Sequence, residues 1–207
     1  MINPSEDIII VSSGGSTQIL AQNTNGPANY ELYINDNPTP FHTQSNTTFY
    51  NGPLLSGLTE NQYCELVVTQ GGSSISKFFT ILVDNTTSQA MASGLEDGIN
   101  YDDTDATKAT LVLNAPNKDF VYVAGSFNNY TPTSSDAMKQ DPSSGKFWLE
   151  LTGLTPGQVY NYQYWVAADS PVADSPELVK TADPFSTMVL SPFDDPWISD
   201  TTFPGLT

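Results

Sequence analysis

Short runs of β-forming residues, each ended by turn residues, divide this sequence from one end to the other. The runs alternate apolar and polar side chains, as a strand with one buried face does, and no long stretch has the period of an amphipathic helix. The turns between the runs draw on 14 Gly and 15 Pro. We therefore predict an all-β protein.

The first domain is predicted over residues 1–84. Strand-like runs occur at 7–11, 17–22, 30–35, 48–50, 63–69 and 76–83. Residues 58–63 (LTENQY) resemble the turn before a late strand in fibronectin-III and immunoglobulin-like β-sandwiches, and short strands at this spacing fit such a fold. The resemblance implies an architecture and carries little functional content.

A linker and a second domain are predicted after residue 84. Residues 85–97 are polar and patternless, which is typical of a linker, and the second domain then spans 98–207. Its strand-like runs are 110–114, 120–124, 146–152 and 159–167. In the last run, alternation separates a predicted core face (Tyr160, Tyr162, Tyr164, Val166) from a face that mixes amides with an indole (Asn161, Gln163, Trp165).

The charge of the chain excludes several classes of partner. Six basic residues, all Lys, stand against 23 acidic ones, for a net charge of −17. Nucleic-acid binding relies on Arg and on basic stripes, and anionic membrane surfaces repel an acidic protein. No apolar run is long enough to span a bilayer. We expect neither a nucleic-acid partner nor membrane insertion.

The chain has few of the residues that ligate zinc. Cys64 and His42 are the only cysteine and the only histidine, so no Cys/His zinc site can be assembled. Cys64 occupies an alternating strand position, which favours a buried structural thiol. An acidic cluster offers oxygens for calcium, but its spacing matches no EF-hand, and solvated loop charges explain it (Asp97, Asp102, Asp103, Asp105). We expect no cofactor, with a structural calcium as the alternative.

Residues 120–130 (FVYVAGSFNNY) carry the clearest functional signal. An apolar strand runs into Gly125, which permits a tight bend, and then into an Asn-Asn turn closed by Tyr130. Amides beside an exposed ring suit a sugar, because amides bond hydroxyls and a ring covers the C–H face of a pyranose. The alternative is structural: Asn128 and Asn129 form the turn, and Tyr130 caps the end of the sandwich.

The second domain resembles the glycogen- and starch-binding sandwich modules that precede the catalytic barrel of α-amylase-family glycoside hydrolases. The resemblance rests on four segments in the same order and spacing: 121–130, 146–151 (KFWLEL), 154–166 (LTPGQVYNYQYWV) and 182–184 (ADP). It implies an early-set β-sandwich like a carbohydrate-binding module. Residues 98–101, 111–116 and 182–185 are further similar to the N-terminal region of secreted α-amylase-family enzymes from Bacteroidetes-type bacteria.

This second resemblance implies a noncatalytic part of an extracellular, cell-surface or periplasmic enzyme. A C-terminal catalytic barrel of the same parent chain would be its partner. No motif selects a pair of carboxylates for glycoside hydrolysis, and an amylase barrel alone needs about 250 residues. We therefore expect no catalysis within these 207 residues.

The resemblance also implies a ligand site. Tyr130, Gln163 and Lys180 fall where glycogen-binding members place Trp, Lys and Trp. We predict weak α-glucan binding, with stacking on Tyr130 and on Trp165 or Trp148, and with hydroxyls bonded by Asn128, Asn129, Gln163 and Lys180. For Trp148 the alternative is packing against a neighbouring domain. Two other functions stay open: a structural spacer that packs against the barrel, and a module that binds another polysaccharide, such as a β-glucan.

Overall fold

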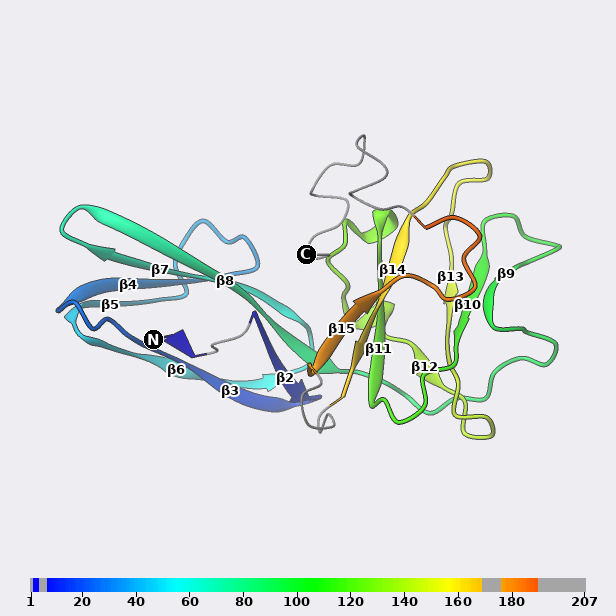
Figure 1. Ribbon diagram of the computed structural model, residues 1–207, viewed down its shortest axis with the longest axis horizontal. Helices are drawn as coiled ribbons and strands as arrows, with labels where there is room; N and C mark the ends of the chain where they lie inside the picture. The colour runs from blue at the N-terminus through cyan, green and yellow to red at the C-terminus, as the bar shows by residue number, and fades with distance from the viewer. Residues whose placement is uncertain (1, 4–6, 169–175, 190–207) are drawn as a thin grey trace. The chain divides into compact units, whose positions relative to one another are not determined.

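The protein is almost entirely β, as the sequence predicts (Figure 1). A computed structural model describes residues 2–3, 7–168 and 176–189. The chain divides into two compact units, Met1–Asp84 and Asn85–Thr207. Among the described residues, no helix has the length and apolar character needed to cross a membrane.

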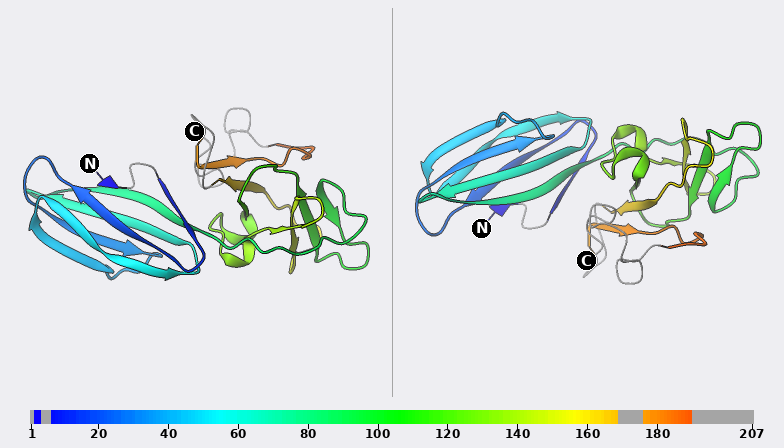
Figure 2. Two further views of the ribbon diagram at one scale, coloured as in Figure 1. Left: turned by 90° about the horizontal axis from the view of Figure 1, so that it is seen from below. Right: turned by 90° about the horizontal axis from the view of Figure 1, so that it is seen from above.

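The first unit is a sandwich of two sheets (Figures 1 and 2). One sheet has three strands in the order β1-β3-β6, and the other has five in the order β2-β8-β7-β4-β5. β2 pairs with β8 in parallel, and the other neighbours are antiparallel. The strands are β1 (Ile2–Asn3), β2 (Ile8–Ser12), β3 (Gly15–Gln22), β4 (Ala28–Ile34), β5 (His42–Thr47), β6 (Phe49–Leu58), β7 (Gln62–Gln70) and β8 (Ser73–Asp84).

The core of the first unit lies between its two sheets. Ile19 of β3 and Tyr50 of β6 meet Leu32 of β4 and Ile81 of β8, and all four side chains are fully buried. Cys64 belongs to the same core, and burial raises the pKa of its thiol to about 12. Its thiolate is therefore scarce at neutral pH, which makes Cys64 an inert structural thiol.

The second unit is also a sandwich (Figure 2). A four-stranded sheet has the order β12-β13-β10-β9, and a three-stranded sheet has the order β11-β14-β15. The strands are β9 (Gly98–Tyr101), β10 (Ala109–Leu113), β11 (Phe120–Gly125), β12 (Lys139–Gln140), β13 (Phe147–Leu151), β14 (Tyr162–Ala167) and β15 (Leu178–Thr181). Two short 3-10 helices, η1 (Ser126–Asn128) and η2 (Ser134–Asp136), follow β11.

β11 and β14, two strands of the three-stranded sheet of the second unit, are buried on both faces. The inner face of this sheet supplies Val123 and Tyr164 to the core, opposite Phe147 of the other sheet. Its outer face, which the sequence marks as mixed in character, carries Tyr122 and Trp165, at 0% and 4% exposed. This outer face is therefore not a solvated surface.

Residues 85–97, predicted as a linker, hydrogen-bond to the second unit. Ser88 bridges Gln140 of β12 in parallel, with Gln89 N–H donating to the Gln140 carbonyl over 3.0 Å. Met91 N–H donates to the Asp141 carboxylate at 3.1 Å, and Asp97 pairs with Lys146 at 2.7 Å. The segment thus adds an extra strand-like edge to the four-stranded sheet. Patternless side chains did not reveal this, because the backbone makes most of these contacts.

Candidate functional site

The turn after β11 is built around the amide of Asn128. Its Oδ1 accepts a hydrogen bond from Gly125 N–H at 2.8 Å, and its Nδ2 donates to the Val123 carbonyl at 2.9 Å. Both polar ends of this amide serve the backbone, so the structural alternative describes Asn128. Asn129 is exposed and takes the left-handed conformation that ends η1, with φ of 52°. Neither side chain is among the residues that line the pocket described below.

Gly125 has an extended backbone that any residue could adopt, so glycine is not needed for its conformation. It is needed because neighbouring atoms approach its Cα closely. A Cβ at this position would lie 2.5 Å from Cε1 of Phe127 and 2.7 Å from the carbonyl oxygen of Asn161. The second contact is to backbone and cannot move aside easily. Gly125 therefore lets the turn pack directly onto the chain entering β14.

Tyr130 closes the turn in an unusual backbone conformation. Its φ is 56°, in the left-handed region that bulky side chains rarely occupy. Its N–H bonds back to the Gly125 carbonyl at 2.9 Å, which fixes the conformation. The ring is half-buried, and burial raises the pKa of its phenol. Within the described part of the chain, the Tyr130 hydroxyl is buried without a hydrogen-bond partner.

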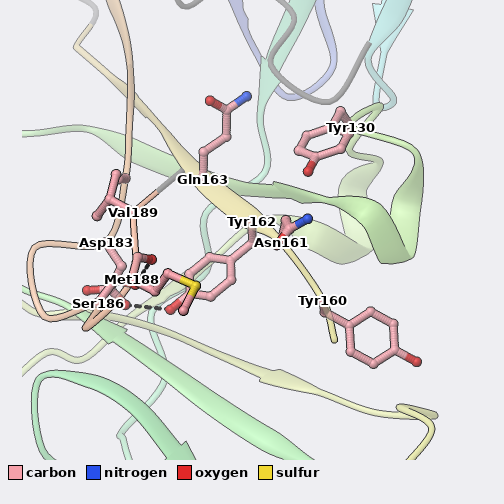
Figure 3. A pocket seen from close by; sticks show the side chains of 10 residues that line it. Tyr130, Tyr160, Asn161, Tyr162, Gln163, Asp183, Ser186, Met188 and Val189 are labelled. Atoms are coloured by element: carbon pink, nitrogen blue, oxygen red, sulfur yellow. Dashed lines mark hydrogen bonds between the residues drawn. The ribbon is translucent and has the colours of Figure 1, made fainter. Parts of the chain in front are cut away.

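A pocket of about 90 Å³ lies beside Tyr130 (Figure 3). Gln163 of β14 contributes an amide that is only 3% exposed. Neither its Nε2 nor its Oε1 has a hydrogen-bond partner among the described residues. Figure 3 shows the Gln163 amide and the Tyr130 ring on the same side of β14. A buried amide without partners is costly, which makes Gln163 the most unusual polar group of the pocket.

The opposite side of β14 forms the rest of the pocket around Asp183. Alternation turns the Tyr162 ring away from Gln163 and toward Asp183, as Figure 3 shows. Asp183 Oδ2 accepts hydrogen bonds from the hydroxyls of Tyr162 at 2.7 Å and Tyr164 at 3.1 Å. Its Oδ1 accepts from Phe185 N–H at 2.8 Å. Burial, and next the neighbouring Asp183 carboxylate, raises the pKa of Tyr162, so the phenol stays a donor.

Trp165 and Lys180 pair with each other instead of lining the pocket. They are cross-strand partners in the register of β14 and β15, and the Lys180 ammonium lies 4.3 Å from the centroid of the indole. This is a cation–π contact, and it occupies one face of a ring that is only 4% exposed. In this structure Trp165 therefore offers no open platform for a sugar.

Trp148 is buried on the outer face of the other sheet. Its indole N–H donates to the Gln89 carbonyl at 3.0 Å, and the Lys139 ammonium lies 4.5 Å from the ring centroid. At 9% exposed, the ring packs under the segment that was predicted as a linker. The packing alternative describes Trp148 better than the platform does, and its covering partner is a segment of its own unit.

The structure thus brings two of the seven predicted site residues, Tyr130 and Gln163, into one pocket. The predictions missed the residues on its other wall: Tyr160, Asn161, Tyr162, Ala182, Asp183, Ser186, Met188 and Val189. Sequence alternation does put Tyr162 opposite Gln163. The Ala-Asp-Pro segment was a sequence signal for Asp183. It did not indicate that Tyr162 and Tyr164 of β14 would be the hydrogen-bond donors to this carboxylate.

The acidic cluster is engaged locally. Asp102 Oδ1 accepts from the hydroxyl and N–H of Thr104, and Asp105 Oδ1 accepts from those of Thr107. These hydrogen bonds lower the pKa of both carboxyls. Among the described residues, no group of His, Cys, Asp and Glu is arranged to hold a metal ion.

Comparison with known proteins gives similarity only among solved structures. No protein-family model matches the chain, and no curated protein does. A group B Streptococcus pullulanase in complex with maltotetraose is 13% identical with a TM-score of 0.33, over 85% of this chain and 23% of that one. Fibronectin(III)-like modules of Clostridium thermocellum CbhA are 11% identical with a TM-score of 0.35, over 92% of this chain and 98% of theirs.

A third similar structure is Bacteroides uniformis β-glucuronidase 3. It is 12% identical with a TM-score of 0.28, over 88% of this chain and 24% of that one. The chain thus spans about a quarter of the length of the pullulanase and the glucuronidase that it matches.

Proposed function

We propose that this chain is a noncatalytic accessory region of an α-glucan-active glycoside hydrolase, and that its second unit binds α-glucan weakly. The observation that carries the proposal is the buried Gln163 amide, which lines a pocket without a hydrogen-bond partner among the described residues. The half-buried Tyr130 ring beside it supplies an apolar surface. The resemblance of residues 98–207 to starch-binding modules supports the same ligand class.

Recognition would combine the amide with the ring. A primary amide carries donors and an acceptor, so Gln163 can serve two neighbouring hydroxyls of one sugar at once. The Tyr130 ring would cover a C–H face of the same sugar, and its hydroxyl would take a further hydrogen bond. A neutral ligand fits the net charge of −17, which repels anionic polymers.

The size of the pocket limits the ligand to one sugar ring at a time. Its volume is about 90 Å³, well below the roughly 300–1,000 Å³ of sites for larger ligands. Burying one aromatic face contributes about 1.5–3 kcal/mol, and each hydrogen bond adds about 1 kcal/mol net. After the cost of association, the expected Kd is on the order of 0.1–1 mM.

Affinity electrophoresis of the whole chain in amylopectin gels tests this proposal. We expect retardation that Gln163→Ala and Tyr130→Ala each reduce. Gln158→Ala is the matched control, because Gln158 is an exposed glutamine of the same unit outside the pocket. Tyr130→Phe keeps the ring and removes only the hydroxyl. Migration of the wild-type chain at the same rate with and without amylopectin would refute the proposal.

A second function is favoured by the burial of Trp148 and Trp165. Rings that are covered within their own unit offer few platforms for a sugar, which suits a structural spacer whose partner would be a C-terminal catalytic barrel of the same parent chain. The amylopectin experiment decides between the two functions, because retardation that Gln163→Ala reduces is not expected of a pure packing module. A parallel gel with a mixed-linkage β-glucan tests the third function, binding of another polysaccharide. In each case the resemblance to secreted α-amylase-family enzymes supports an extracellular, cell-surface or periplasmic parent enzyme.

A further inference from the structure

The first unit presents an aromatic surface that none of the functions above uses. It lies on the face of the five-stranded sheet that is turned away from β3 and β6. Tyr33 of β4, Glu65 of β7 and Phe78 of β8 stand side by side in one row, because Glu65 pairs with both of the other two. Glu65 is thus flanked by an aromatic ring on each neighbouring strand.

A cavity of about 420 Å³ opens on this row. Tyr63 adds a third ring, two residues before Glu65 on the same strand, and the turn 36–38 between β4 and β5 borders the cavity. Phe78 is 66% exposed, and with Tyr33 and Tyr63 lining the same cavity it belongs to a group of rings at the surface. The volume lies within the range of sites for ligands larger than one functional group.

Two carboxylates, Glu65 and Asp36, are among the polar groups of this surface. The Glu65 carboxylate lies between the rings and forms no ion pair within the described ranges. The Tyr33 hydroxyl donates a hydrogen bond to the Glu31 carboxylate at 3.3 Å, which helps to fix the orientation of the ring within the row. Asp36, in the bordering turn, adds a second carboxylate to the cavity. A ligand that bonds these carboxylates and covers the rings must bring hydrogen-bond donors together with apolar faces.

We infer that this surface of the first unit, with Tyr33, Glu65 and Phe78 at its centre, binds a neutral glycan chain. Sugar hydroxyls donate to Glu65, and the flat C–H faces lie on the rings. An organic cation would also bring donors to these carboxylates. However, cation–π attraction is weak at exposed rings and grows only when the rings are desolvated. The 66% exposure of Phe78 therefore favours a ligand that lies along an open surface over one enclosed in a cage.

This inference is independent of the Gln163 pocket, since it rests on a different unit and on different residues. The two sites can be tested apart in the same whole chain. Phe78→Ala removes the most exposed ring, and Glu65→Gln keeps the shape but halves the acceptor capacity. Ile75→Ala is the matched control, because Ile75 is on the same strand and is also 66% exposed but does not line the cavity.

The experiment is affinity electrophoresis in amylopectin and in mixed-linkage β-glucan gels, with every variant made in wild-type and in Gln163→Ala backgrounds. In at least one gel, we expect Phe78→Ala to weaken binding about tenfold in both backgrounds, as loss of one buried aromatic face implies. Glu65→Gln should weaken it less, and Ile75→Ala should leave it unchanged. The gel in which the effect appears identifies the type of glucan.

Backbone amide resonances of residues 63–66 and 77–80 provide a second readout, with maltoheptaose, a soluble β-glucan oligosaccharide and choline as probes. Shifts with either sugar that Phe78→Ala abolishes support the inference. Equal retardation of wild type and Phe78→Ala in both gels would overturn it. Shifts with choline but with neither sugar would also overturn it, in favour of a cation site. Loss of all binding in Gln163→Ala alone would assign the glucan entirely to the second unit.

Discussion

The turn after β11 allows a sharp test of whether the Asn-Asn pair serves folding or binding. Asn128→Ala removes the acceptor of Gly125 N–H and the donor to the Val123 carbonyl, with contacts of 2.8 and 2.9 Å. Both backbone groups belong to residues that are buried. A buried group left without its partner costs about 1–3 kcal/mol. The two losses together should lower the free energy of unfolding of the second unit by about 2–4 kcal/mol, a large share of the stability of a small domain.

Asn129 provides the matched control one residue away. It is exposed and left-handed, so Asn129→Gly should be neutral or slightly stabilising, and Asn129→Ala should cost about 1 kcal/mol. Urea unfolding followed by tryptophan fluorescence measures all three variants, since every tryptophan of the chain lies in the second unit. If Asn128→Ala costs no more than Asn129→Ala, the two hydrogen bonds do not hold the turn. The reasoning is then refuted, and Asn128 becomes free to act as a ligand group.

Three further predictions concern ionisable groups. Cys64 should react with a thiol reagent at pH 8 about a thousandfold more slowly in the folded chain than in urea, because its pKa rises from 9.0 to about 12 on burial. Tyr162 and Tyr164 have raised pKa values in the folded protein, so their contribution to the free energy of unfolding is complete below pH 10 and is lost as the pH rises. The urea midpoint of the second unit should therefore fall above pH 10, and it should fall less when both tyrosines are changed to Phe. Hydrogen bonds from Ser143 and Ser144 lower the pKa of Asp141, so its contribution to the free energy of unfolding is complete above about pH 4 and is lost on acidification. Asp141→Asn should remove that part of the acid dependence of the urea midpoint.

The core faces of the strands could be predicted because alternation encodes them directly. Tyr164 and Val166 lie in the core of the second unit as the pattern in 159–167 indicates. The strand itself begins only at Tyr162, because the turn before it extends further than the apolar run suggests. The short strands His42–Thr47 and Leu178–Thr181 were not predicted. Both lie at sheet edges, where one partner strand suffices and the apolar pattern is weak.

The sequence did not predict which segments cover the outer faces of the sheets. For this reason Trp148 and Trp165, which were predicted as sugar platforms, are buried in the structure. Alternation correctly placed Trp148 opposite the core side chains of β13, and it placed Trp165 beside Gln163. It carried no information that Gln89 would accept from the Trp148 indole, or that Lys180 would lie over Trp165. These contacts join segments distant in sequence. Alternation alone therefore does not distinguish an aromatic ring that is exposed on the outer face of a sheet from one that another segment covers.

Gln163 offers a way to separate binding from packing in a single residue. A buried amide without partners destabilises a fold by about 1–3 kcal/mol, whereas an apolar side chain of similar size at the same place carries no such penalty. Gln163→Leu should therefore raise the free energy of unfolding of the second unit by about that amount in urea, and it should reduce retardation in amylopectin gels as much as Gln163→Ala does. An increase in stability coupled to a loss of binding marks a residue that serves recognition at the expense of the fold. A Gln163→Leu variant that is less stable than wild type would mean that the amide has partners in the folded protein, and the pocket would lose its central ligand group.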